Sequence, residues 1–142
     1  MRYSFKYRKE RSKIEKEVYR PVASVYIKGI DGNWYLFYPY IDSGADISLF
    51  TKTDCELLGY NLEEGNEHLV GCISGLVRIF VHEIQMKIGE DVFDVKVGFA
   101  DSEEVPRLLG RFSIFPKFLI CFDEKDLIVH FIKWLGFSNG MG

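Results

Sequence analysis

The sequence predicts an all-β, closed or barrel-like fold with one or two short helices. Aromatic residues make up 15% of the 142 residues, with 12 Phe and 8 Tyr, and such side chains favour strands. The apolar runs are short, several alternate with a two-residue period, and turn residues separate them. The length fits a single domain over residues 1–142, and a hydrophobic content of 47% is enough for a core.

The chain begins with two predicted strands. Aromatic and polar residues alternate over residues 2–8, which is the period of a half-buried strand, and the polar residues 9–13 predict a turn after it. A second strand is expected over residues 18–28, where Pro21 indicates a sheet edge or a bulge.

The next segment is expected to form a hairpin followed by a helix. Residues 29–33 are turn residues, so the strand at 34–41 should return along its predecessor, and a short strand is expected at 47–50. Thr51 is a good N-cap and Gly59 a good C-cap, which predicts a helix over residues 52–58.

The second half of the chain is predicted to consist mainly of hairpins. The expected elements are a polar turn at 61–66, two strands within 68–88 joined by a loop at 71–75, a strand at 92–99, an acidic loop at 101–104, a helical turn ending near 115, and a hairpin of strands 118–122 and 127–131. Residues 136–142 are rich in glycine, which predicts a loose tail.

Charge is distributed unevenly along the chain. Residues 1–20 form a basic N-terminal arm with a net charge of +5, whereas the remainder carries −8. Such an arm can bind nucleic acid or anionic lipid, but it is more often a solvated strand face or a contact for an acidic partner. We therefore expect no nucleic acid and no membrane among the partners.

The cysteines and the absence of targeting signals bear on location and cofactors. The three cysteines, Cys55, Cys72 and Cys121, have no CxxC spacing, which argues against a disulfide framework or a zinc site. We expect free thiols, no metal and no other cofactor. Residues at the N-terminus contain no signal-peptide core, and no apolar run approaches the ~20 residues that span a bilayer. These features predict a cytoplasmic protein.

One polar turn lies between two apolar runs. The stretch LFYPYIDSGADISLF, residues 36–50, places Asp42-Ser43-Gly44-Ala45-Asp46 in its middle. Asp, Ser and Gly are ordinary turn residues, so a simple tight turn is one interpretation. The apolar flanks favour a turn held inside the fold, where a carboxylate costs free energy unless it is hydrogen-bonded.

Three features in this order resemble the retropepsins, the single-domain aspartic proteases typified by the retroviral proteases. They are the Asp42-Ser43-Gly44 triplet after an apolar strand, the glycine-flanked loop Gly71-Cys72-Ile73-Ser74-Gly75, and Leu108-Leu109-Gly110-Arg111. The resemblance covers residues 22–131, and the arm before it extends beyond the usual retroviral pattern. It implies the retropepsin fold, with a flap hairpin over the cleft.

The resemblance also implies a role for each matching residue. Asp42, Ser43 and Gly44 would be the catalytic triplet, with Ser43 hydrogen-bonding across a dimer axis. Arg111 would pair with Asp46. Substrate-binding residues would be Ala45, Asp46, Gly71, Cys72, Ile73, Ser74 and Gly75. Structural support beneath the triplet would come from Leu108, Leu109, Gly110 and Arg111.

This reading makes the protein an aspartic endopeptidase. Two adjacent carboxylates can activate a water molecule and protonate a carbonyl oxygen if they share one proton. The chain has one Asp-Ser/Thr-Gly triplet, so the second carboxylate must come from another copy, and a homodimer acting on extended peptides is expected. The alternative is a non-catalytic dimeric module of the same fold that binds peptides or assembles with partners. The basic arm alone supports a third reading, a nucleic-acid-binding barrel.

Overall fold

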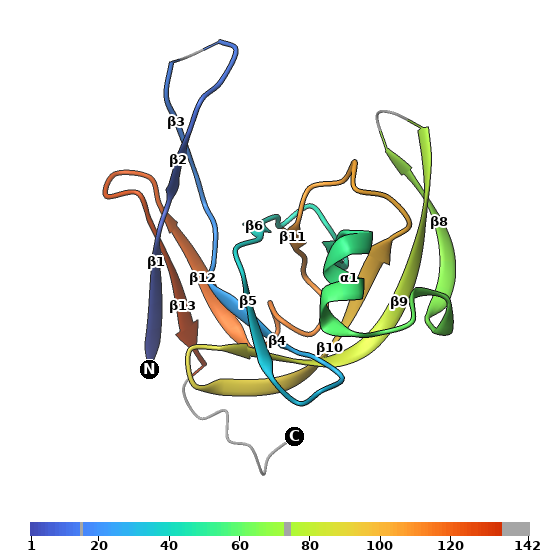
Figure 1. Cartoon of the computed structure of the whole chain (residues 1–142). Helices are drawn as coiled ribbons and strands as arrows, with labels where there is room; N and C mark the ends of the chain where they lie inside the picture. Colours follow the sequence, from blue (N-terminus) through green and yellow to red (C-terminus); the bar gives the residue numbers. More distant parts are fainter. Residues whose placement is uncertain (15, 73–74, 135–142) are drawn as a thin grey trace.

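The main body of the protein is a large curled sheet. The structure is a computed structural model that describes residues 1–14, 16–72 and 75–134. Its main strands are β4 (Val25–Lys28), β5 (Trp34–Phe37), β6 (Tyr40–Ile41), β7 (Ser48–Phe50), β8 (Asn66–Cys72), β9 (Gly75–Ile88), β10 (Asp91–Ala100) and β11 (Leu108–Leu109). They form one eight-stranded sheet in the order β5-β4-β9-β10-β7-β11-β6, with β8 paired to β9 outside this path. In Figure 1 the long strands β9 and β10 curve around β6 and β11, which lie near the centre of the view. The predicted all-β, barrel-like class is confirmed.

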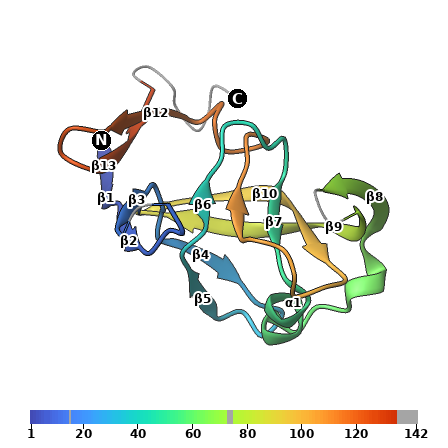
Figure 2. The same cartoon turned by 90° about the horizontal axis from the view of Figure 1, so that it is seen from above.

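The two ends of the chain form a second sheet. Its strands are β1 (Arg2–Lys6), β12 (Phe118–Asp123) and β13 (Ile128–Lys133). The order is β1-β13-β12, and both pairs are antiparallel. Strands β2 (Arg8–Glu10) and β3 (Val18–Arg20) form a separate two-stranded hairpin. Figures 1 and 2 show this hairpin and the β8–β9 hairpin at opposite sides of the molecule, with β6 and β11 between them.

Alternating burial along the strands builds the core. In β10, Val95 and Val97 are buried while Asp94 and Lys96 are exposed, as the two-residue period of a strand requires. Aromatic side chains pack edge to face in this core, including Phe50 against Phe37 at a ring-centroid distance of 5.4 Å. Many of the aromatic residues of the sequence therefore contribute to the hydrophobic core.

Helix α1 (Lys52–Leu58) has the predicted bounds. The Thr51 side chain accepts a hydrogen bond from the Asp54 backbone, and the Asp54 side chain accepts one from the Thr51 backbone, which forms a capping box. Gly59 ends the helix at φ 84°, in the left-handed region that glycine adopts without strain. Burial raises the pKa of the Cys55 thiol on this helix to about 11.

Two predicted strands are interrupted, and both breaks fall at prolines. The segment predicted as one strand over 18–28 divides into β3 and β4 at Pro21, and the strand predicted over 34–41 divides into β5 and β6 at Pro39. Proline has no N–H to donate to a sheet. Both prolines accept hydrogen bonds instead, Pro39 from the Ala23 amide and Pro21 from the Ile41 amide.

Several smaller boundaries also differ from the prediction. The first strand ends at Lys6, and the predicted turn at 9–13 begins later because Lys9 and Glu10 belong to β2 and pair with β3. The polar turn at 61–66 contains the short 3-10 helix η1 (Leu62–Glu64). The predicted helical turn after Arg111 is a series of turns, in which the Ile114 and Phe115 amides donate to the Arg111 carbonyl and the Lys117 amide donates to the Ile114 carbonyl.

Two sequence predictions concern parts of the chain that lie beyond this description. The glycine-rich tail at 136–142 lies outside the described residues, as does the middle of the loop at 71–75. Within the described ranges, no helix is long and apolar enough to cross a membrane.

Candidate active site

Asp42 begins a tight turn directly after β6. Its backbone amide donates to the Leu109 carbonyl at 3.0 Å, and its carbonyl accepts from the Ala45 amide at 3.2 Å. The Asp42 Oδ1 atom accepts a hydrogen bond from the Gly44 amide at 2.8 Å. A side chain at Gly44 would approach this oxygen, because an added Cβ would lie 3.2 Å from it. The turn therefore fixes the direction in which the carboxyl group points.

Strand β6, which leads into this turn, is held on both sides. On one side it pairs in parallel with β11, Tyr40 opposite Leu108 and Ile41 opposite Leu109. On the other side Val22 forms an isolated antiparallel bridge with Tyr40. A strand of two residues makes few hydrogen bonds, so these two neighbours determine the position of β6.

The loop after β11 crosses the Asp42 turn at close range. The Gly110 amide donates to the buried Ser48 Oγ at 3.0 Å. The Arg111 amide donates to the Ala45 carbonyl at 2.9 Å, and the Phe112 amide donates to the Asp46 carbonyl at 2.8 Å. These backbone hydrogen bonds tie the two loops together.

Gly110 is required at this crossing by space. An added Cβ would lie 2.5 Å from the Ile47 carbonyl carbon and oxygen and 3.0 Å from the Ala45 oxygen. All three are backbone atoms, which cannot rotate away as a flexible side chain can. The glycine thus permits the close approach of the two loops.

The expected ion pair between Asp46 and Arg111 is wrong for this structure. Both side chains are exposed, and the described residues show no salt bridge between them. The reason is that the two loops meet through main-chain atoms, with the Arg111 amide bonded to the Ala45 carbonyl.

A different ion pair supports the region. Arg107 donates from Nε to Asp54 Oδ2 at 2.7 Å and from a terminal nitrogen to Asp54 Oδ1 at 3.0 Å, a bidentate arrangement. The hydrogen bond with Asp54 raises the pKa of Arg107. The pair joins helix α1 to the segment before β11. Sequence reasoning missed it, because Asp54 is also a capping residue and Arg107 lies far along the chain.

A cavity of about 680 Å³ opens beside the turn. Its walls come from the Asp42 turn, β7, the β8–β9 hairpin and the segment before β11. The lining residues are Gly44, Ala45, Asp46, Ile47, Leu49, Val70, Gly71, Val77, Ile79, Glu104, Val105, Pro106 and Leu108. Apolar side chains dominate this surface, as in most sites for small ligands and side chains.

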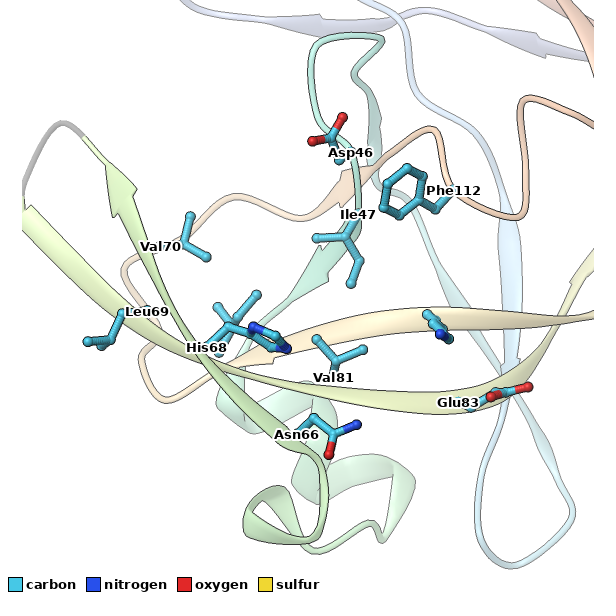
Figure 3. A pocket seen from close by; sticks show the side chains of 11 residues that line it. Asp46, Ile47, Asn66, His68, Leu69, Val70, Val81, Glu83 and Phe112 are labelled. Atoms are coloured by element: carbon cyan, nitrogen blue, oxygen red, sulfur yellow. The ribbon is translucent and has the colours of Figure 1, made fainter.

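A second cavity of about 560 Å³ adjoins the first and shares part of its wall. In Figure 3, Asp46, Ile47 and Phe112 lie on one side of it. Val70 and Val81, from the two strands of the β8–β9 hairpin, lie on the other side. Together the two cavities form a groove between the Asp42 turn and the hairpin.

The predicted site residues differ in where they lie. Ala45, Asp46, Gly71 and Leu108 line the first cavity, and Leu109 is buried behind it. Ser43 is exposed, and its side chain makes no hydrogen bond within the described part of the chain. Gly75 begins β9 at φ 123° and does not line either cavity. Ile73, Ser74 and the side chain of Cys72 lie outside the description.

Several lining residues were not anticipated. Val77 and Ile79 lie two apart on β9, and the strand period would have placed them on one face. Glu104, Val105 and Pro106 had no comparable signal, because only the fold brings the acidic loop to the cavity.

Comparison with known proteins supports the architecture. No protein-family model matches the chain, and no curated protein matches its sequence. A retropepsin-like aspartic protease from Rickettsia conorii superposes with a TM-score of 0.62 at 18% sequence identity, covering 92% of this chain and 98% of that one. The EIAV protease complexed with the inhibitor HBY-793 superposes with a TM-score of 0.52 at 23% identity, covering 74% of this chain and 91% of that one. The chain therefore has a retropepsin-like fold.

Proposed function

We propose that the protein is an aspartic endopeptidase that hydrolyses peptide bonds in extended polypeptide segments. The observation that carries the proposal is the Asp42 turn, which is fixed by β11 and by the Gly44 amide within a retropepsin-like fold. Two proteins with which it superposes are a retropepsin-like aspartic protease from Rickettsia conorii and the EIAV protease.

The active form is a homodimer. The sequence has one Asp-Ser/Thr-Gly triplet, and no carboxylate is hydrogen-bonded to Asp42 within the described ranges of one chain. A two-fold axis through the turn brings the same residue of two copies face to face. The exposed Ser43 hydroxyl lies in the same turn, where it can donate across that axis.

The two Asp42 carboxyl groups would have different roles in hydrolysis, one as the base and one as the acid. Two like charges at roughly 3 Å cannot both persist, so the pair holds one proton between them. The ionised group takes a proton from the attacking water, and the protonated group donates a hydrogen bond to the scissile carbonyl oxygen. Such proton transfers contribute roughly 10²–10⁴ in rate.

The β8–β9 hairpin would hold the substrate as a flap. In the part of the chain that the structure describes, β8 pairs with β9 and with no other strand, so its other edge is open to a further strand. An extended peptide can add to such an edge as a further strand, with its side chains entering pockets on alternate sides. The two adjoining cavities provide pockets of this kind.

The deciding experiment replaces Asp42 with Asn. Wild-type protein is incubated with a library of unfolded peptides at mildly acidic pH, and new termini are identified by mass spectrometry. We expect defined cleavage by the wild type, none by Asp42→Asn, and a dimer of the wild type in sedimentation under the same conditions. Asp94→Asn is the matched control, because Asp94 is an exposed residue of β10 that lines neither cavity.

Three outcomes would count against the proposal. Cleavage that persists in Asp42→Asn would remove Asp42 from the mechanism. Activity in a strictly monomeric protein would exclude the shared pair of carboxylates. A wild-type dimer that binds peptides and leaves them intact would favour the non-catalytic module.

A further inference from the structure

The larger cavity beside the Asp42 turn has an unbalanced charge. Most of its wall is apolar, and among the described residues that line it only Asp46 and Glu104 are charged, both acidic. Both side chains are exposed, so they lie at the rim and the apolar groups form the wall below. By contrast, the adjoining cavity contains Lys96 as well as acidic residues.

Two cations that adjoin cavity-lining residues in the sequence form salt bridges elsewhere. Arg107 forms the bidentate pair with Asp54. Arg78 pairs with Glu67 and with Asp101. Arg111 follows the Gly110 crossing beside Asp46 but forms no salt bridge with it. Within the described residues, neither rim carboxylate therefore has an ion-pair partner.

The loop that carries Glu104 is well anchored. The Glu104 amide donates to Ser102 Oγ at 2.9 Å. Glu103 Oε2 accepts from the Thr53 amide at 2.7 Å, and the Lys52 amide donates to the Ser102 carbonyl at 3.3 Å. These bonds fix the loop to the first turn of helix α1, so the position of Glu104 is set before a ligand arrives.

We propose that this cavity receives an arginine or lysine side chain of the peptide substrate, and that Glu104 determines this specificity. The aliphatic stem of such a side chain covers apolar surface while its charged end stays at the rim. There the charged end forms charge-assisted hydrogen bonds with the carboxylates of Glu104 and Asp46. Because Gly44 and Ala45 line the cavity, this subsite lies close to the scissile bond. The inference rests on the proposed peptidase function.

The test compares arginine with citrulline, its neutral isostere, in otherwise identical peptides. Each pair carries the substitution at one position flanking the cleaved bond of an apolar peptide that the wild type cleaves. At one position we expect a kcat/KM about fivefold higher for arginine, the upper range for pairs with exposed carboxylates. The preference should shrink at high ionic strength.

Two variants assign the preference to one residue. Glu104→Gln should reduce the ratio of kcat/KM for the arginine and citrulline peptides, leaving only the part of the preference that Asp46 contributes. Glu103→Gln is the matched control, because it removes the same charge from a neighbour that lines neither cavity, and glutamine can still accept the Thr53 hydrogen bond. This control should retain the preference.

The outcomes separate the two proposals. Cleavage of neutral peptides with no preference for arginine at any position, or a preference that Glu104→Gln leaves undiminished, would overturn the inference and leave the peptidase function standing. If no peptide is cleaved, the proposed function fails, and non-cleavable peptides with a reduced amide test the subsite by their dissociation constants. Equal affinity for the arginine and citrulline forms would then overturn the inference.

Discussion

Replacing Gly110 with alanine would force apart the two loops that carry the site. The new Cβ would lie 2.5 Å from the Ile47 carbonyl group, whereas ordinary contacts lie at 3.4–4 Å. The backbone would therefore have to move by about 1 Å. Overpacking of this kind costs roughly 1–3 kcal/mol. Alanine also lowers the conformational entropy of the unfolded chain, which stabilises the folded state by roughly 0.4–1 kcal/mol. We expect a net loss of about 1–2 kcal/mol, or a fall in Tm of roughly 3–6 °C for a domain of this size.

The same displacement should reduce activity. Gly110 lies between the Leu109 carbonyl, which accepts from the Asp42 amide, and the Arg111 amide, which donates to Ala45. Misplacement of catalytic groups by 1 Å can cost roughly 10²-fold in rate. We expect kcat/KM for peptide cleavage to fall by about that factor, measured well below the melting temperature.

The stability control for this variant is Gly71→Ala, because an added Cβ at Gly71 meets no atom within 4 Å. Its Tm should stay close to that of the wild type. An unchanged Tm in Gly110→Ala would refute the close crossing of the two loops. A lower Tm with full activity would refute the link between this crossing and the geometry of Asp42.

Two further substitutions test the supports of the site. Arg107→Ala removes the cation that pairs with the carboxylate of Asp54, whose side chain is 4% exposed. The free energy of unfolding, measured in urea, should therefore fall by about 1–3 kcal/mol. No measurable fall would contradict the structural role of the pair. Tyr40→Phe removes the hydrogen bond from the Tyr40 hydroxyl to Glu10 Oε2 at 2.6 Å and should cost about 0.5–1.5 kcal/mol at neutral pH. That hydrogen bond is the main reason why the pKa of Glu10 is lowered in the folded protein, so its stabilisation is present above the usual Glu pKa of roughly 4.3 and is lost as pH falls below it. The difference between wild type and Tyr40→Phe should therefore narrow in acid, and a difference that widens there would contradict this assignment.

Local signals were sufficient for the helix and for most hairpins. Helix α1 has the predicted bounds because Thr51 and Gly59 act on the backbone within one turn of themselves. The β8–β9 and β12–β13 hairpins were likewise predictable from apolar runs separated by turn residues.

The hydrogen bonds at the two strand breaks, at Pro21 and Pro39, depend on partners that the sequence does not specify. A proline marks the end of regular pairing, but it does not say what its carbonyl will accept. In the fold, the carbonyl of Pro21 accepts from the Ile41 amide and that of Pro39 from the Ala23 amide. These hydrogen bonds hold residues 21–23, which follow the arm, beside β6. Such a contact depends on tertiary arrangement, so the sequence indicated the break without its consequence.

The candidate site also has some features that the sequence predicted and others that only the fold reveals. The order of motifs predicted that the Gly110 loop would lie against the Asp42 turn, because both motifs match one known architecture. The partner of Arg107 is 53 residues away, and nothing in the spacing selected Arg107 over Arg111 as the cation that forms an ion pair. Glu104 reaches the cavity only because its loop is fastened to helix α1.

The basic arm, which extends beyond the retroviral pattern, is part of the scaffold of the site. The carboxylate of Glu10 in β2 accepts a hydrogen bond from the Tyr40 hydroxyl. It also forms salt bridges with Arg8 and Arg20, one from each strand of the β2–β3 hairpin. Tyr40 belongs to β6, two residues before Asp42, so one carboxylate links the arm to the strand that carries the proposed catalytic residue. With β11 on the other side, β6 is clamped between the N-terminal segment and the segment that leads to Gly110. A turn held from both sides can keep its carboxyl group in one direction, which a second copy must match if two such groups are to share a proton.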